Sequence, residues 1–280
     1  MRLRYLVFFV VLAVVVGVGV ALRRGSGPLP DPEGCAAKLA GHQVDLTTEQ
    51  AENATLITAI GVSRGLPARA VSIALATAYQ ESKIRNLTHG DRDSLGLFQQ
   101  RPSQGWGTTK QVRDPYHATN AFYDALEKIA DYKSLRITEA AQEVQRSGYP
   151  EAYEEHAPDA RTLASVLTGY SPGGLFTCVV HDPTSRGNPS QVVRQLERAY
   201  GNLDIARTDS RQDVAVTVAA GQDGRRLGWS VAQFAVAHGV RWHQAAVSYA
   251  GKRWRTGRRS EDGWRSGGGA DATTAVISMG

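Results

Sequence analysis

The chain has 280 residues, of which 32 are basic and 27 acidic, and its formal net charge at pH 7 is +5. This length is sufficient for one large domain or two ordinary ones with hydrophobic cores. The mild positive charge favours residence near anionic polymers. Apart from residues 252–259, no stretch interleaves basic and aromatic residues as nucleic-acid binding requires, so we predict no nucleic-acid partner.

The amino terminus carries the strongest signal for a compartment. Residues 5–22 are uninterruptedly apolar, and arginines flank them on both sides. Such a run can cross a bilayer and is longer than most signal-peptide cores. We therefore predict that residues 1–24 form a single membrane helix, with the bulk of the chain outside the cell; the alternative is a cleaved signal and secretion. Residues 25–34, rich in Gly and Pro, are predicted to be a linker.

The next region, residues 35–178, has the pattern of a mainly α domain. Thr47 and Gln50 have capping-box spacing, which predicts a helix from Thr47 to Arg64. Pro67 opens a second helix, apolar almost all round and therefore buried, which ends near Glu81. Further helices are predicted at residues 114–129, at 137–146 and at 150–168, the last bent or interrupted at Pro158.

Glu81 is the candidate catalytic residue. Its neighbours at helical spacing are Thr77, Ala74 and Ile73. Desolvation, an apolar wall and the negative end of the helix dipole all favour the protonated acid, so its pKa should be raised. Such an acid can protonate a leaving-group oxygen, as glycosidic cleavage requires. The alternative is a helix-end carboxylate that reaches solvent or pairs with Lys83 or Arg85.

The residues around Glu81 resemble the active-site region of the lysozyme-like superfamily, which includes soluble lytic transglycosylases and goose-type lysozymes. The resemblance covers residues 35–178, and residues 90–106 are similar to a subgroup of secreted actinobacterial proteins. Phe98 stands where Met is commoner in the family. The matching residues are Glu81, Ser82, Ser94, Gly96, Leu97, Gln99 and Pro102.

This resemblance implies a lysozyme-like fold and cleavage of the MurNAc-GlcNAc β-1,4 bond of peptidoglycan, with Glu81 as general acid and base. A lytic transglycosylase is favoured. Hydrolysis stays open because Asp91 and Asp93 lie where goose-type enzymes place auxiliary acids, although both residues also suit a turn. No cofactor is expected. The predicted substrate-binding residues are Ser82, Ser94, Gln99, Gln100, Trp106 and Tyr170.

An alternative of another class is a catalytically inactive, membrane-anchored protein that binds peptidoglycan as a scaffold. Its partners would be the glycan strands and, as further candidates, other cell-wall proteins.

The two cysteines, Cys35 and Cys178, lie at the borders of the lysozyme-like region. In an exported protein, two cysteines so placed are expected to form a disulfide. The alternative is two separate buried thiols.

The remainder is predicted to be a linker, residues 179–190, and a small α+β accessory domain, residues 191–280. Its helices are expected at 191–200 and 227–238, and its strands at 214–218, 245–249 and 275–278. This part resembles a C-terminal domain of secreted actinobacterial cell-wall proteins that is related to metal-dependent D-Ala-D-Ala peptidases. The metal-ligand positions fall on residues that cannot hold zinc, so no metal is expected: Ser210, Thr217, Thr274 and Val276.

Overall fold

A computed structural model describes residues 32–208 and 213–279 of the chain. The predicted membrane helix, residues 1–24, and most of the first predicted linker lie outside these residues. Among the residues that are described, no helix is long and apolar enough to cross a membrane. From Glu33 onward the described residues form one compact unit.

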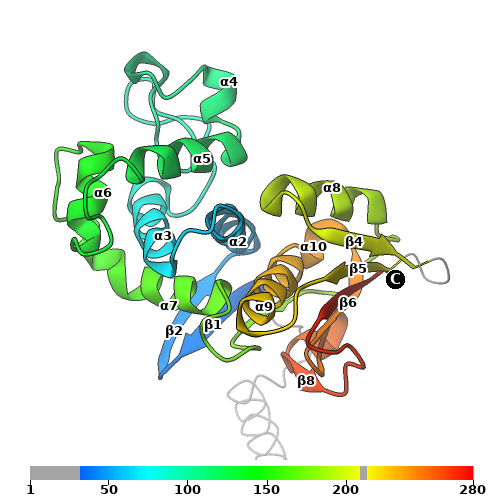
Figure 1. The fold of residues 1–280 in the computed structure, drawn as a ribbon. Coiled ribbons are helices and arrows are strands. Elements are labelled where there is room, and N and C mark those ends of the chain that lie inside the picture. Colours follow the sequence, from blue (N-terminus) through cyan, green and yellow to red (C-terminus); the bar gives the residue numbers. More distant parts are fainter. Residues whose placement is uncertain (1–31, 209–212, 280) are drawn as a thin grey trace, which may run out of the picture. The chain divides into compact units, whose positions relative to one another are not determined.

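The described chain is an α+β protein with two antiparallel sheets (Figure 1). The predicted mixture of helices and strands is confirmed. The strands, however, are not confined to the C-terminal part, because three of them lie in or at the ends of the region predicted to be mainly helical. A three-stranded sheet has the order β2-β1-β3, and a six-stranded sheet has the order β4-β5-β9-β6-β7-β8.

The smaller sheet joins the two ends of the predicted lysozyme-like region. Strands β1 (Gly34–Leu39) and β2 (His42–Leu46) form a hairpin, and β3 (Phe176–Val179) pairs with the other side of β1. The register places Cys35 directly opposite Cys178, and a disulfide joins them. The expected disulfide is confirmed.

Most helices between these strands begin and end close to the predicted residues, but the last begins at Ala157, later than the predicted start at residue 150. Thr47 caps the first helix with the predicted capping box, and Arg146 ends α6 in the left-handed conformation. Pro158 does not interrupt a helix; it lies in the first turn of α7, where its missing N–H would have no partner in any case. The helices are α2 (Thr48–Ser63), α3 (Ala68–Ser82), α4 (Thr109–Val112), α5 (Pro115–Leu126), α6 (Ile137–Gln145) and α7 (Ala157–Leu167), with short 3-10 turns η1 (Pro102–Gln104) and η2 (Glu154–His156).

Helix α3 is the centre of this region. Its residues from Ala70 to Ala78 are all buried, because α2, α5, α6 and α7 pack around it. The apolar surface all round this helix, read from the sequence, is therefore explained by neighbours on every side. The packing fixes the position of its C-terminal turn, which carries Glu81.

The second half of the chain is built on the larger sheet. Helix α9 (Gln222–Ala237) packs against β6 (Gln244–Tyr249) and β9 (Thr274–Met279) (Figure 1). The predicted strands at 214–218, 245–249 and 275–278 and the helix at 191–200 are confirmed to within two residues. The helix predicted at 227–238 is also present but begins earlier, at Gln222. Three short strands were not predicted, namely β4, β7 and β8. The elements are α8 (Pro189–Tyr200), β4 (Asp204–Arg207), β5 (Val214–Thr217), α9 (Gln222–Ala237), α10 (Gly239–Trp242), β6 (Gln244–Tyr249), β7 (Lys252–Arg255), η3 (Gly257–Ser260), β8 (Arg265–Ser266) and β9 (Thr274–Met279).

Two tryptophans from the second half cover the open edge of the smaller sheet. The indole N–H of Trp254 donates to the carbonyl of Cys178, and that of Trp264 donates to the carbonyl of Phe176, at 3.0 and 2.9 Å. Both acceptors belong to β3, an edge strand whose outer carbonyls would otherwise lack partners in the sheet. The two halves of the chain are thus hydrogen-bonded together through β3.

Candidate active site

Glu81 lies in the last turn of α3, just before the helix ends. Lys83 adopts the left-handed conformation with φ 55°, and its N–H donates to the carbonyl of Tyr79. The chain therefore turns away, and Lys83 and Arg85 are exposed. The Glu81 carboxylate instead accepts a hydrogen bond from the hydroxyl of Tyr153, 2.8 Å from Oε1. Within residues 32–208 and 213–279, Glu81 forms no ion pair. The alternative in which it pairs with Lys83 or Arg85 is therefore wrong.

The pKa of Glu81 is raised above its ordinary value, as predicted. Desolvation by burial is the largest cause. Hydrogen bonds from the side chains of Tyr153 and Gln145 act in the opposite direction, because they favour the carboxylate. The result is an acid that holds its proton more tightly than an exposed glutamate and has donors ready when that proton leaves.

Tyr153 remains a hydrogen-bond donor over the whole physiological range. Its ring is fully buried, and burial together with the neighbouring Glu81 carboxylate raises the pKa of its hydroxyl. The residue precedes η2 and α7, so the packing of α7 on α3 brings it to Glu81 from 72 positions along the chain.

The predicted Gly-Leu-Phe-Gln segment is a tight turn held beside Glu81. Leu95 and Gln100 exchange two backbone hydrogen bonds of 3.0 Å across it. The hydroxyl of Ser82 donates to the carbonyl of Leu97 at 2.7 Å, and the Gln145 amide donates to the carbonyl of Phe98 at 2.8 Å. Gln145 therefore contacts both the carboxylate and the turn.

The structure gives several predicted substrate-binding residues internal partners. Ser82 and Ser94 are buried, and Gln100 is buried with its amide donating to the carbonyl of Ala118 on α5. Ser82 and Gln100 thus support the turn from inside. Gln99 is partly exposed, has φ 47° and donates to the carbonyl of Gly96 at 3.2 Å. Of these four, Gln99 is the side chain that reaches the surface.

The two candidate auxiliary acids have different surroundings. Both oxygens of Asp93 are engaged, because it accepts from Arg101 Nε and from the backbone N–H of Ser103 at 2.8 Å each. These contacts, with Arg101 the largest cause, lower the pKa of Asp93. Asp91 has a side chain that is 91% exposed. Asp93 thus braces the loop, as the turn interpretation expected.

The two predicted aromatic residues are placed differently with respect to Glu81. Trp106 follows η1 and is half-buried against the core. Tyr170 follows the C-terminal end of α7, whereas Tyr153 precedes its N-terminal end; eleven helical residues span roughly 16 Å. The Tyr170 ring is 54% exposed and lies 3.9 Å from the Arg226 guanidinium of α9. It is therefore not grouped with Glu81.

A second set of contacts stiffens the same helix end. The His156 ring stacks on Tyr79 with centroids 4.6 Å apart, and its Nε2 lies 2.9 Å from Oε1 of Gln80. Burial is the main cause that lowers the pKa of His156, which favours the neutral ring. Tyr153, Gln145 and His156 were not predicted, because no local spacing links them to Glu81.

No group of three or more His, Cys, Asp or Glu side chains among the described residues could hold a metal ion. Thr217 and Thr274, two of the positions matched to metal ligands, face each other across β5 and β9. Val276 is opposite Ala215 on the same strands, and Ser210 lies outside the described residues.

Comparison with known proteins assigns no family to the chain: no protein-family model matches it, and no curated protein does.

Proposed function

We propose that this chain is an exported, lysozyme-like enzyme that cleaves peptidoglycan glycan strands, with Glu81 as general acid and then general base. One observation carries the proposal: Glu81 is a half-buried carboxyl group with a raised pKa, hydrogen-bonded by Tyr153 and paired with no cation of the described residues. Burial disfavours an ionised carboxylate, so a carboxylate with a structural role alone would be more stable in solvent. The resemblance of the Glu-Ser and Gly-Leu-Phe-Gln segments supports the same reaction.

The hydrogen-bond geometry suggests how the two proton transfers divide between the carboxyl oxygens. Tyr153 donates to Oε1, which leaves Oε2 to carry the proton. Transfer of that proton to the glycosidic oxygen breaks the C1–O bond, and the departing sugar leaves as an alcohol. The carboxylate so formed is stabilised by the donors already in place, Tyr153 and Gln145.

The second step is proposed to be intramolecular. The Glu81 carboxylate accepts the proton of the 6-hydroxyl of MurNAc, whose oxygen bonds to C1 and gives a 1,6-anhydro end. Hydrolysis by an inverting or retaining route would require a second carboxylate as base or nucleophile. Asp93 is held by Arg101 and Ser103, and Asp91 extends into solvent, which favours the route that needs one carboxylate.

The test is digestion of purified sacculi by the full chain, with products identified by mass. We expect muropeptides one water lighter than hydrolysed ones, and a loss of rate of at least about a hundredfold in Glu81→Gln. Glu143→Gln is a matched control, because Glu143 is an exposed carboxylate on α6, the helix that carries Gln145. It should cleave like the unaltered chain.

Unchanged cleavage by Glu81→Gln would contradict the proposal. Retention of the chain on sacculi without any released product would instead favour the scaffold protein. Products with the mass of hydrolysed muropeptides would show that water attacks, and Asp91 would then be the candidate for the second carboxylate.

A further inference from the structure

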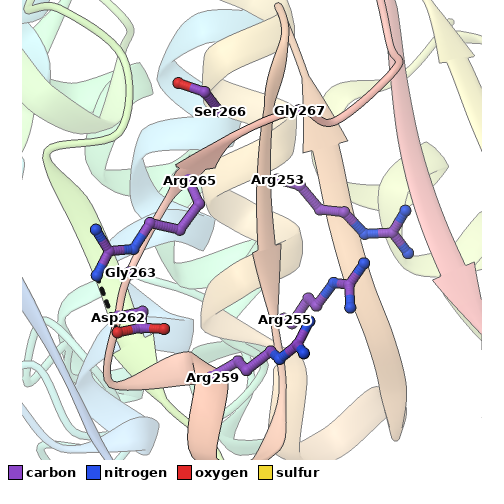
Figure 2. A pocket seen from close by; sticks show the side chains of 8 residues that line it. All are labelled: Arg253, Arg255, Arg259, Asp262, Gly263, Arg265, Ser266 and Gly267. Atoms are coloured by element: carbon purple, nitrogen blue, oxygen red, sulfur yellow. Dashed lines mark hydrogen bonds and ion pairs between the residues drawn. The ribbon is translucent and has the colours of Figure 1, made fainter.

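A second site lies on the larger sheet, at its β7–β8 edge. Here four arginines surround a hollow (Figure 2). They come from β7, from η3 and from β8. We call this the arginine pocket; its lining residues are Arg253, Arg255, Arg259, Asp262, Gly263, Arg265, Ser266 and Gly267.

The arrangement follows from the alternation of side chains along β7. Trp254 is fully buried, so Arg253 and Arg255 project from the opposite face of the sheet. In the antiparallel register Arg265 of β8 stands directly opposite Arg253. Like charges in directly opposed positions destabilise a strand pair. The register therefore brings two positive charges to the same edge of the sheet.

The acidic residues do not balance the charge. Asp262 pairs with Arg265 at 2.9 Å, and Figure 2 shows this pair on one side of the hollow. Within the described part of the chain, neither Arg255 nor Arg259 forms an ion pair, and both side chains line the hollow (Figure 2). Residues 252–266 contain six basic and two acidic residues, a net charge of +4 in a chain whose total is +5.

The backbone beneath the arginines is fixed. The buried hydroxyl of Ser260 donates to the carbonyl of Gly257 at 2.7 Å, which holds η3. The glycine-rich segment after β8 is tied back by hydrogen bonds from the backbone N–H groups of Gly267 and Gly268 to the carbonyl of Gly251. A Cβ on Gly268 would lie 2.3 Å from the carbonyl oxygen of Lys252, so the segment approaches β7 closely.

We propose that the arginine pocket binds a phosphate group of an anionic polymer of the cell wall. Guanidinium forks match the paired oxygens of phosphates and carboxylates. Phosphate is favoured because more than one guanidinium lacks a balancing charge, and a phosphate offers more acceptor oxygens than a carboxylate does. That the polymer belongs to the wall rests on the proposed function; the phosphate site itself does not.

The test is isothermal titration of the full chain with an oligomer of poly(glycerol phosphate) and, separately, with inorganic phosphate. The double variant Arg255→Gln/Arg259→Gln should bind the oligomer at least tenfold more weakly. The slope of log affinity against log salt should become shallower by roughly 0.7 for each phosphate group that the variant no longer neutralises. Circular dichroism and the melting temperature of the variant establish that it is folded.

Two further variants separate this site from general charge and from catalysis. Arg258→Gln removes one exposed charge from the same turn without touching the pocket and should weaken binding by less than the double variant. Glu81→Gln should bind the poly(glycerol phosphate) oligomer as tightly as the unaltered chain does, because Glu81 does not line the arginine pocket. The binding test therefore remains valid if the enzymatic proposal fails.

Four results would overturn the proposal. These are unchanged binding by the double variant, an equal loss in Arg258→Gln, equal affinity for an oligoglutamate of the same charge, and tighter binding of a DNA duplex than of the oligomer. The last would indicate a nucleic-acid site. Equal affinity for inorganic phosphate and the oligomer would reassign the pocket to a small phosphate ligand.

Discussion

The pKa of Glu81 is set by two opposing effects that come from different parts of the chain. The buried end of α3 disfavours the charged form, and the side chains of Tyr153 and Gln145 favour it. The Tyr153 hydroxyl is one of the groups that lower this pKa, so removal of that hydroxyl alone should change it. This makes the site testable without altering the acid itself.

We expect Tyr153→Phe to move the alkaline limb of the activity profile to higher pH. The hydroxyl donates to Glu81, so its removal raises the pKa of the acid further, and the protonated form persists at higher pH. One lost hydrogen bond of about 1 kcal/mol corresponds to a shift of somewhat less than one pH unit. The measurement is kcat/KM for sacculus digestion across pH.

Tyr149→Phe is the control, because Tyr149 is 78% exposed and precedes Tyr153 by four positions. Its profile should coincide with that of the unaltered chain. A shift of the Tyr153→Phe profile to lower pH would contradict the assignment of Tyr153 as a donor to the carboxylate.

His238 leads to a separate prediction about stability. It is fully buried between Phe234 and Trp242, and its Nδ1 lies 2.8 Å from the carbonyl of Phe234. Burial lowers the pKa of His238 from 6.5 to about 3. Between these two values the unfolded chain takes up a proton that the folded chain does not.

Stability should therefore fall as the pH decreases from about 6.5, by at most roughly 1.4 kcal/mol per pH unit from this group. The measurement is the free energy of unfolding in urea at several pH values. In His238→Gln the absolute stability will be lower, but the slope against pH should be less steep. An unchanged slope would exclude His238 as its cause.

At the scale of secondary structure, the elements that the sequence predicted well are those with local signals. Thr47 with Gln50, and Asp114 with Pro115, mark helix starts by themselves, and the observed caps use those same side chains. The missed strands have weak signals. Strand β1 is rich in alanine, which has low strand propensity, β2 has five residues, and β3, β4, β7 and β8 have four residues or fewer.

The candidate site divides in the same way. Glu81 and the turn at residues 96–99 could be found because each is a short contiguous pattern. Tyr153 could not, since only the packing of α7 on α3 brings it to the carboxylate. Nor does the pattern distinguish a side chain that faces a ligand from one that supports a turn, which is why it predicts substrate binding for Ser82 and Gln100.

Gly228 of α9 provides a test of packing between elements. A Cβ at this position would lie 2.1 Å from the ring and hydroxyl of Tyr249. That ring is held in place, because its hydroxyl donates to the carbonyl of Ala272 at 2.8 Å and Trp229 packs edge-on against it.

Gly228→Ala should therefore lower the free energy of unfolding by about 1–3 kcal/mol, although alanine is the better helix former. Urea unfolding measures the change. Gly148→Ala is the comparison, since a Cβ there meets nothing within 4 Å. If both variants were equally stable, Tyr249 would have room to move.

At the scale of the whole molecule, the disulfide joins strands that begin and end the proposed catalytic region. Cys35 and Cys178 are separated by 143 positions. The chain-entropy model gives up to about 5 kcal/mol for closing a loop of this length. Two tryptophans from the other half bind the same strand, so the effect should extend beyond the smaller sheet.

We expect reduction with dithiothreitol to shift the urea midpoint of the chain markedly downward. The urea midpoint of the double variant Cys35→Ser/Cys178→Ser should lie near that of the reduced chain, and dithiothreitol should not change it. A midpoint that is the same with and without dithiothreitol would show that the bond adds little.

The cross-link also makes residues 35–178 a covalent ring. One proteolytic cut within that ring opens the backbone but separates nothing, because the two pieces remain joined through sulfur. A nicked chain would therefore keep its full mass on a non-reducing gel and split in two only when the gel is reducing. For a protein proposed to work outside the cell among secreted proteases, survival of a first cut is a direct benefit of where the two cysteines stand.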